Sequence, residues 1–106
     1  MKLLVLKGPL ASGKTDFAIK KIESEKDEKW VRISRDDLKK MKGSPLSEGQ
    51  YMLINAWEDN CVIHSLVSGH NVILDSLNLN DDYNKKREEM LKGMFPAVEI
   101  EYQEFG

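Results

Sequence analysis

The chain has 106 residues, 41% hydrophobic and 32% charged, a balance that can build one packed core and excludes a disordered tail. Its 16 Lys+Arg and 18 Asp+Glu leave a formal charge of -2, so any contact with nucleic acid would need a local basic patch. The aliphatic run at 3–6 is far shorter than the roughly 20 residues of a membrane span. A single cysteine excludes an intrachain disulfide. We therefore expect one soluble, cytoplasmic domain over residues 1–106, with no membrane partner.

The hydrophobic pattern predicts strands separated by helices. Short apolar or alternating runs predict strands, and apolar side chains at intervals of three to four residues predict helices. In chain order we expect a strand at 2–6, a helix at 14–26, a strand at 30–34, helices at 35–42 and 47–68, a strand at 71–75, a helix at 81–94 and a strand at 97–105. Gly43-Ser44-Pro45 marks the clearest loop.

This alternation predicts an α/β fold. Strands that are joined through helices make right-handed crossovers, and these produce a four-stranded parallel sheet flanked by helices on both faces. The apolar side chains of 47–68 cover most of the helix circumference and leave a narrow polar stripe near Asn55, Glu58 and Asp59. We expect that helix to be largely buried, against the sheet or a partner.

The segment GPLASGKT at 8–15 matches the Walker A pattern G-x-x-x-x-G-K-[ST], between a predicted strand and a predicted helix. Its glycines let the backbone curl so that consecutive N–H groups point at a phosphate chain, and the following helix adds positive potential. The lysine reaches the β- and γ-phosphates, and the threonine hydroxyl binds Mg²⁺. The residues predicted to hold ATP and Mg²⁺ are Gly8, Ala11, Ser12, Gly13, Lys14 and Thr15.

Acidic residues follow two of the predicted strands. Asp36 and Asp37 come after the strand at 30–34, and Asp75 ends the strand at 71–75. Ligands of doubly wound sheets bind beyond these strand ends, where one acid could hold Mg²⁺ and another could take a proton from an acceptor hydroxyl. The alternative for Asp36 and Asp37 is capping of the next helix, with Lys39 and Lys40, three and four residues on, as partners. Beside a phosphate-binding loop, we favour a functional role for one of the two.

Three segments, GPLASGKT, RISRDDLKK and VILDSLNLN, resemble the kinase domain of bacteriophage-type 5′-hydroxyl polynucleotide kinases. The resemblance runs from residue 2 to about 103 and implies a P-loop kinase fold with ATP and Mg²⁺ as donor and a 5′-hydroxyl DNA or RNA end as acceptor. It implies that the first and third strands are neighbours, which would bring Asp75 close to Thr15. The matching positions are Asp36 for the general base, Lys14 for the phosphates, Thr15 and Asp75 for the metal side, and Arg35 and Lys39 for the acceptor.

The chain departs from that family at three points. Leu77 stands where a threonine is common. Lys39 stands where the family has an arginine on the acceptor phosphate, which keeps the charge and loses the bidentate fork. The family continues into a lid that carries an arginine, whereas the arginines here are Arg32, Arg35 and Arg87, none in a lid position. We therefore expect a domain without its C-terminal lid, which transfers phosphate slowly unless a second copy or a partner chain completes the site.

Three functions stay open on the sequence. The first is ATP-dependent phosphorylation of a polynucleotide 5′-hydroxyl, which is favoured by the basic residues Arg35, Lys39 and Lys40 around Asp36. The second is a small-molecule kinase on the same scaffold. The third is a non-catalytic nucleotide-binding module of a larger assembly, which the missing lid favours.

Overall fold

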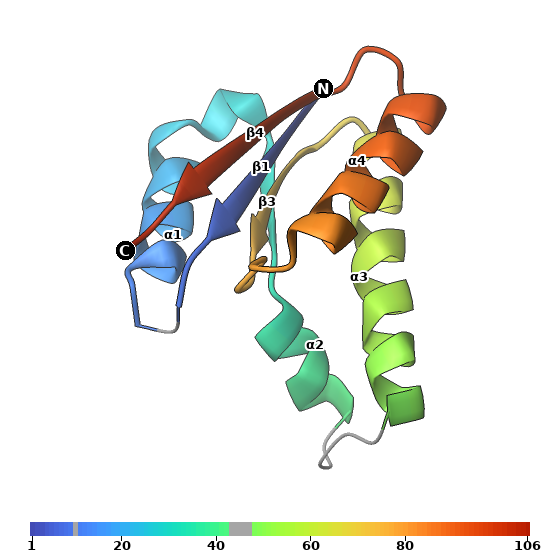
Figure 1. Ribbon diagram of the computed structural model, residues 1–106. Coiled ribbons are helices and arrows are strands. Elements are labelled where there is room, and N and C mark those ends of the chain that lie inside the picture. The colour runs from blue at the N-terminus through green and yellow to red at the C-terminus, as the bar shows by residue number, and fades with distance from the viewer. Residues whose placement is uncertain (10, 43–47) are drawn as a thin grey trace.

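The computed structural model describes residues 1–9, 11–42 and 48–106; the predicted loop at 43–45 and Leu10 of the 8–15 segment lie outside them. The elements are β1 (Lys2–Lys7), α1 (Lys14–Ser24), the 3₁₀ turn η1 (Lys26–Glu28), β2 (Trp30–Ile33), α2 (Arg35–Lys42), α3 (Glu48–Val67), β3 (Asn71–Asp75), α4 (Asp81–Met94) and β4 (Glu99–Glu104) (Figure 1). The predicted order of strands and helices is confirmed.

At two places the element ends differ by two residues from the sequence predictions. The first helix ends at Ser24, two residues early, because Glu25 leaves helical geometry and Lys29 adopts a left-handed φ of 55° after η1. The last strand begins at Glu99 because the Val98 N–H turns back to the carbonyl of Phe95. Turns of this kind depend on local hydrogen bonds that hydrophobic periodicity does not encode.

The four strands form one parallel sheet in the order β2-β3-β1-β4. The predicted parallel sheet is confirmed, and so is the predicted pairing of the first and third strands. In the β1–β3 register, Leu6 lies opposite Asp75, so the end of β3 is held next to the start of the 8–15 segment. The carboxyl ends of the strands therefore meet at a single edge, where ligands of such sheets bind.

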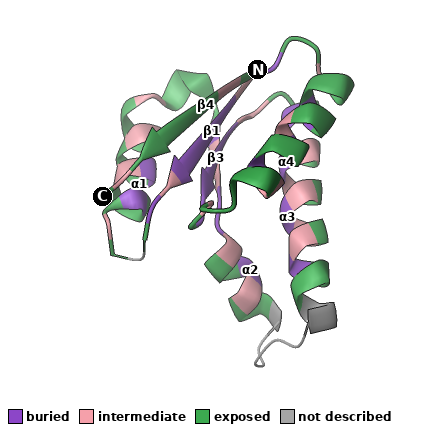
Figure 2. Cartoon of the chain, viewed as in Figure 1, coloured by how far each residue is buried: buried purple, intermediate pink, exposed green. Residues whose placement is uncertain are grey.

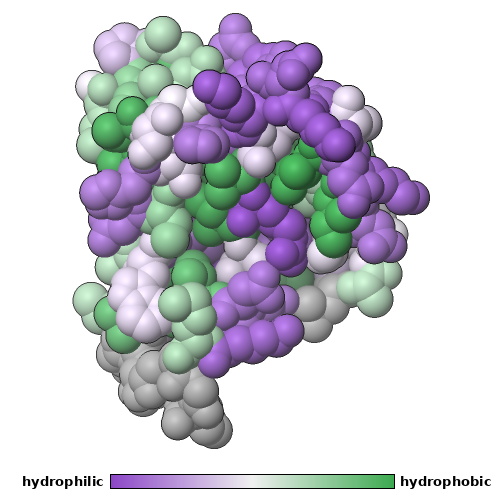
Figure 3. Space-filling model, turned by 180° about the vertical axis from the view of Figure 1, so that it is seen from behind, coloured by the Kyte–Doolittle hydropathy of each residue, from purple (hydrophilic) through white to green (hydrophobic). Residues whose placement is uncertain are grey.

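Helices cover both faces of the sheet, as predicted. Leu3 and Val5 of β1 pack against α3 and α4, whereas Leu4 and Leu6 point to the opposite face, where Ala18 of α1 lies (Figure 1). The inner strands are buried on both faces, while the edge strand β4 is largely exposed (Figure 2). From behind, apolar side chains near the middle of the visible face are interspersed with hydrophilic ones, and further apolar side chains lie toward its upper edge (Figure 3).

The long helix α3 is less buried than its composition suggests. It contacts the core through Ile54, Val62 and Leu66, while Met52 and Val67 are mostly exposed. One member of the predicted polar stripe, Glu58, is 1% exposed, because it is paired with a buried arginine of α4 described below. None of the helices in the described ranges combines the length and the apolar character that a membrane span requires.

A single side chain ties together the strand ends that carry the site. The amide nitrogen of Asn78 donates to the carbonyls of Leu6 (2.6 Å), Leu74 (3.2 Å) and Ser76 (3.2 Å). Asn78 also has a left-handed φ of 52°, a conformation that asparagine tolerates better than most residues. Asn78 thus fixes the turn after β3 against the end of β1.

We predict that Asn78→Ala lowers the free energy of unfolding by about 1–3 kcal/mol, because partly buried carbonyls lose their donor and alanine is strained at positive φ. Urea unfolding followed by circular dichroism measures the change. Leu79→Ala, at an exposed neighbouring position, is the control and should stay within about 0.5 kcal/mol of wild type. Equal stability of the two variants would contradict the role given to Asn78.

Candidate active site

The loop between β1 and α1 needs both of its glycines. Gly13 has a φ of 91°, a left-handed conformation that disfavours other residues. At Gly8 a Cβ atom would lie 2.6 Å from the carbonyl oxygen of Phe105, a contact too close to accommodate. The loop therefore curls tightly between the last residue of β1 and the first turn of α1.

The ammonium group of Lys14 lies inside this loop. Its Nζ donates to the carbonyl oxygens of Gly8 (2.6 Å) and Pro9 (2.8 Å), and the side chain is buried. A lysine ammonium has three hydrogens, so one donor is left for a further acceptor. The buried Ser12 hydroxyl oxygen has no hydrogen-bond partner within the part of the chain that the structure describes. Together with the curled backbone, these groups fit a bound phosphate chain.

Thr15 and Asp75 meet at the base of the loop. The Thr15 hydroxyl donates to Asp75 Oδ2 over 2.8 Å, which confirms the expected proximity of these two residues. Mg²⁺ is typically bound by one or two carboxylates together with waters and substrate phosphates, and one hydroxyl with one carboxylate fits that donor set. The described residues contain no cluster of three or more His, Cys, Asp or Glu that could hold a metal alone. Phosphate oxygens and water would have to supply the remaining ligands.

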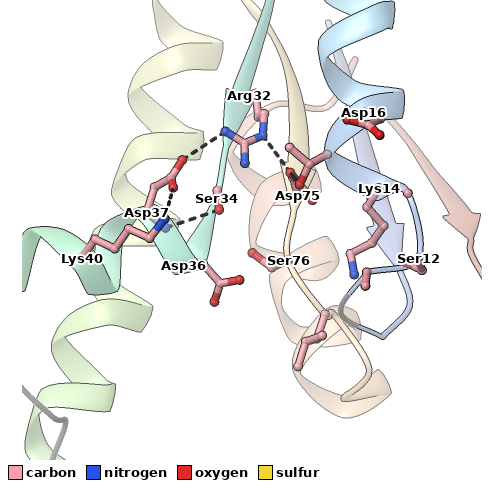
Figure 4. A pocket seen from close by; sticks show the side chains of 14 residues that line it. Ser12, Lys14, Asp16, Arg32, Ser34, Asp36, Asp37, Lys40, Asp75 and Ser76 are labelled. Carbon is pink, nitrogen blue, oxygen red and sulfur yellow. Dashed lines mark hydrogen bonds and ion pairs between the residues drawn. The ribbon is translucent and has the colours of Figure 1, made fainter.

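Arg32 was not predicted to belong to the site. Its Nε donates to Asp75 Oδ2 (2.7 Å) and its Nη1 to Asp37 Oδ2 (3.0 Å), so one guanidinium bridges two acids (Figure 4). Burial lowers the pKa of Arg32, but the hydrogen bonds and charges of Asp75 and Asp37 outweigh it and raise that pKa above its ordinary value. The β2–β3 pairing brings Arg32 to Asp75, 43 positions away, so no sequence signal could have assigned that contact.

Asp36 and Asp37, the two acids at the start of α2, have different surroundings in the structure. The Asp37 N–H donates to the Ser34 hydroxyl, so Ser34 provides the helix cap. Each acid forms an ion pair of 3.9 Å with the lysine three residues later in the chain, Asp36 with Lys39 and Asp37 with Lys40. Asp37 is also bound by Arg32, whereas the Asp36 carboxylate is 59% exposed and points toward the space beside the loop (Figure 4).

Two clefts open at this edge of the sheet. The loop cleft, of about 610 Å³, is lined by Ala11, Ser12, Gly13, Lys14, Thr15, Asp16, Arg32, Ser34, Asp36, Asp37, Lys40, Asp75, Ser76 and Leu77. The helical cleft, of about 310 Å³, lies among α2, α3 and α4 and includes Arg35, Asp36, Lys39, Asn55, Glu58 and Arg87. Asp36, Ser76 and Leu77 line both clefts, so Asp36 stands at the boundary between them. Of the predicted site residues, Gly8 alone lines neither.

A buried network supports the wall of the helical cleft. Glu58 Oε1 accepts a hydrogen bond from Arg87 Nη2 (2.9 Å) and lies 3.9 Å from Arg35 Nη1. The Ser76 hydroxyl donates to Glu58 Oε2 (3.3 Å) and accepts from the Arg35 backbone N–H (3.0 Å). Burial raises the pKa of Glu58, and the charges of Arg87 and Arg35 offset only part of that rise. Ser76 thus joins the end of β3, next to Asp75, to the start of α2, next to Asp36.

We predict that Ser76→Ala lowers the free energy of unfolding by about 1–3 kcal/mol, since a buried carboxylate and a backbone N–H would each lose a partner. The control is Ser68→Ala, at an exposed position after α3, which should be neutral within about 0.5 kcal/mol. Chemical unfolding of wild type and the two variants in the same buffer measures the difference in the free energy of unfolding. A neutral Ser76→Ala would mean that this hydroxyl does not hold α2 in place.

The arrangement defines an α/β protein with the P-loop kinase fold. The chain is similar to a chain in a solved structure of a Pnkp1/Rnl/Hen1 complex, with 30% identity and a TM-score of 0.80 over 99% of this chain. It is also similar to a chain in a structure of the Pnkp1/Rnl/Hen1 RNA repair complex, with 29% identity and a TM-score of 0.75 over 98% of this chain. It spans 35% and 32% of those two chains, about a third of their length. No protein-family model and no curated protein sequence matches it.

Proposed function

We propose that this chain is the phosphoryl-transfer domain of a polynucleotide 5′-kinase that uses ATP and Mg²⁺. The observation that carries the proposal is the position of Asp36, which lines both the loop cleft and the helical cleft. A group that removes a proton from an acceptor must reach the acceptor and lie beside the phosphate that is transferred. The similarity to chains of a complex that includes Pnkp1, a polynucleotide kinase, supports the same acceptor class.

The loop cleft is the proposed site for the phosphates of ATP. Lys14 and the backbone N–H groups of the loop would bind the phosphate oxygens, and Ser12 would donate its hydroxyl hydrogen to one of them. Thr15 and Asp75 would hold Mg²⁺, which when bound supplies positive charge against the charge that develops on the phosphates.

The helical cleft is the proposed site for the acceptor. Arg35 and Lys39 lie on its wall and provide positive charge for an acceptor phosphate. Asp36 would accept the proton of the 5′-hydroxyl while the acceptor's 5′-oxygen forms a bond to the γ-phosphorus. The bond between that phosphorus and the β–γ bridging oxygen breaks at the same time. ADP then leaves, and the acceptor carries a 5′-phosphate.

The arginines of the described residues favour a second candidate function, nucleotide binding with little transfer. Arg32 is held by Asp75 and Asp37, Arg87 is buried against Glu58, and Arg35 faces the helical cleft. The burial of Arg87 opposes a role for its guanidinium on the transferring phosphoryl group. Such an arginine contributes about 10³–10⁵ in rate, and we expect it to come from a partner chain or from further sequence. The origin of the similar chains in a multi-protein complex supports a partner.

Lys14→Ala should lower kcat for phosphate transfer from ATP by at least about 10²-fold, because a preorganised charge facing the phosphates is lost. The control is Lys20→Ala, an exposed lysine on the same helix, which should retain wild-type turnover. Transfer of labelled γ-phosphate to a 5′-hydroxyl oligonucleotide is the measurement, with thermal unfolding to verify that both variants fold. Wild-type turnover in a folded Lys14→Ala protein would refute the assignment of the loop cleft.

Asp36→Asn should lower kcat by about 10²–10⁴-fold and leave the ATP dissociation constant within about twofold, since only proton removal is affected. The matched control is Asp37→Asn, the neighbouring acid that faces Arg32 and Lys40, which should lose far less turnover. Equal losses in the two variants, or a parallel loss of ATP binding in Asp36→Asn, would assign Asp36 to the helix or the metal instead.

A further inference from the structure

An exposed aromatic ring stands beside the helical cleft. Tyr51 of α3 is 46% exposed and lies one helical turn before Asn55, a residue of the cleft wall. The Lys39 ammonium, which belongs to the same wall, lies 6.0 Å from the centroid of the Tyr51 ring. The ring and the cleft thus share Lys39, and the ring borders the cleft on the side where α2 faces α3.

The helical cleft is too small for a strand. Its volume of about 310 Å³ is at the lower end of the range of about 300–1,000 Å³ for small-molecule sites, which suits one terminal nucleoside. The rest of a polynucleotide must leave across the rim of the cleft. An exposed aromatic ring with a cation over one face is a combination that suits single-stranded nucleic acid, because a base can stack on the other face while a phosphate approaches the charge.

The charges along α2 fit this path. Lys39 and the strongly exposed Lys40 are three residues from Asp36 and Asp37, and each lysine–acid pair is separated by 3.9 Å. Contacts of that length between exposed groups are weak, so a phosphate can compete for the lysines. In a chain whose formal charge is -2, this short basic segment supplies the local patch that a strand needs.

We propose that Tyr51 and Lys39 form a binding surface for the second nucleotide of a single-stranded acceptor, with its base stacked on Tyr51 and its phosphate near Lys39. The inference rests on the proposed function of the helical cleft and adds the route by which the strand leaves it. It makes Tyr51 a residue that distinguishes polynucleotide acceptors from acceptors of one nucleotide.

The test compares two acceptors, a 5′-hydroxyl oligonucleotide of ten nucleotides and a nucleoside 3′-monophosphate, with wild type and three variants. Tyr51→Ala should raise the oligonucleotide KM by about 5- to 150-fold, the equivalent of about 1–3 kcal/mol per stacked base, with kcat unchanged. The KM for the nucleoside 3′-monophosphate should not change. Tyr51→Phe keeps the ring and should behave as wild type, and so should Met52→Ala, at the 73% exposed neighbour.

Several outcomes separate this inference from the proposed function. If wild type phosphorylates the oligonucleotide and Tyr51→Ala does so with the same KM, the surface is refuted while the kinase stands. A KM that rises equally for both acceptors would mean a distorted cleft, and would also overturn the surface. Loss of oligonucleotide affinity in Tyr51→Phe would rule out stacking. If wild type phosphorylates only small sugars, the proposed function itself fails.

Discussion

The parallel pairing of β1 with β3 is the constraint on which the site depends. It sets Leu6 opposite Asp75 and so brings the 8–15 loop, which follows one strand, to the acid that ends the other. The amide of Asn78 holds the two strand ends together by bonding carbonyls on both. Since a register shift of one residue in a strand reverses the face of every side chain, the contact between Thr15 and Asp75 exists only in this register.

Two arginines near the site, Arg32 and Arg87, are paired with acids in different surroundings. Arg32 lies between two acids at the edge of the loop cleft, whereas Arg87 is enclosed with Glu58 behind the wall of the helical cleft. A buried pair of this second kind is costly to desolvate and adds little net stability, but removal of one partner would leave an uncompensated charge. Its effect here is positional, because Glu58 also holds Ser76 and through it the start of α2.

The sequence was sufficient where a local pattern determines the result. Hydrophobic runs gave the strands and helices within a few residues, and the 8–15 motif located the loop, because loop and helix geometry follow from neighbouring residues. The parts that it missed depend on tertiary contacts. The sequence pattern places Glu58 in a polar stripe, and it contains no sign of the hydrogen bond from Arg87, 29 positions away, that accompanies the burial of Glu58. Arg32 and Ser76 likewise acquire their partners only through the packing of β2, β3 and α2.

The exposure of Asp36 has a consequence for fidelity. A carboxylate that is 59% exposed is hydrated, and a water molecule beside it is a nucleophile much like an alcohol. In the proposed role, Asp36 would therefore activate water as readily as an acceptor hydroxyl whenever the helical cleft holds only solvent. Transfer to an acceptor would then be favoured over hydrolysis of ATP only when a molecule bound in that cleft displaces water from the carboxylate. The bound acceptor itself would have to exclude water from Asp36.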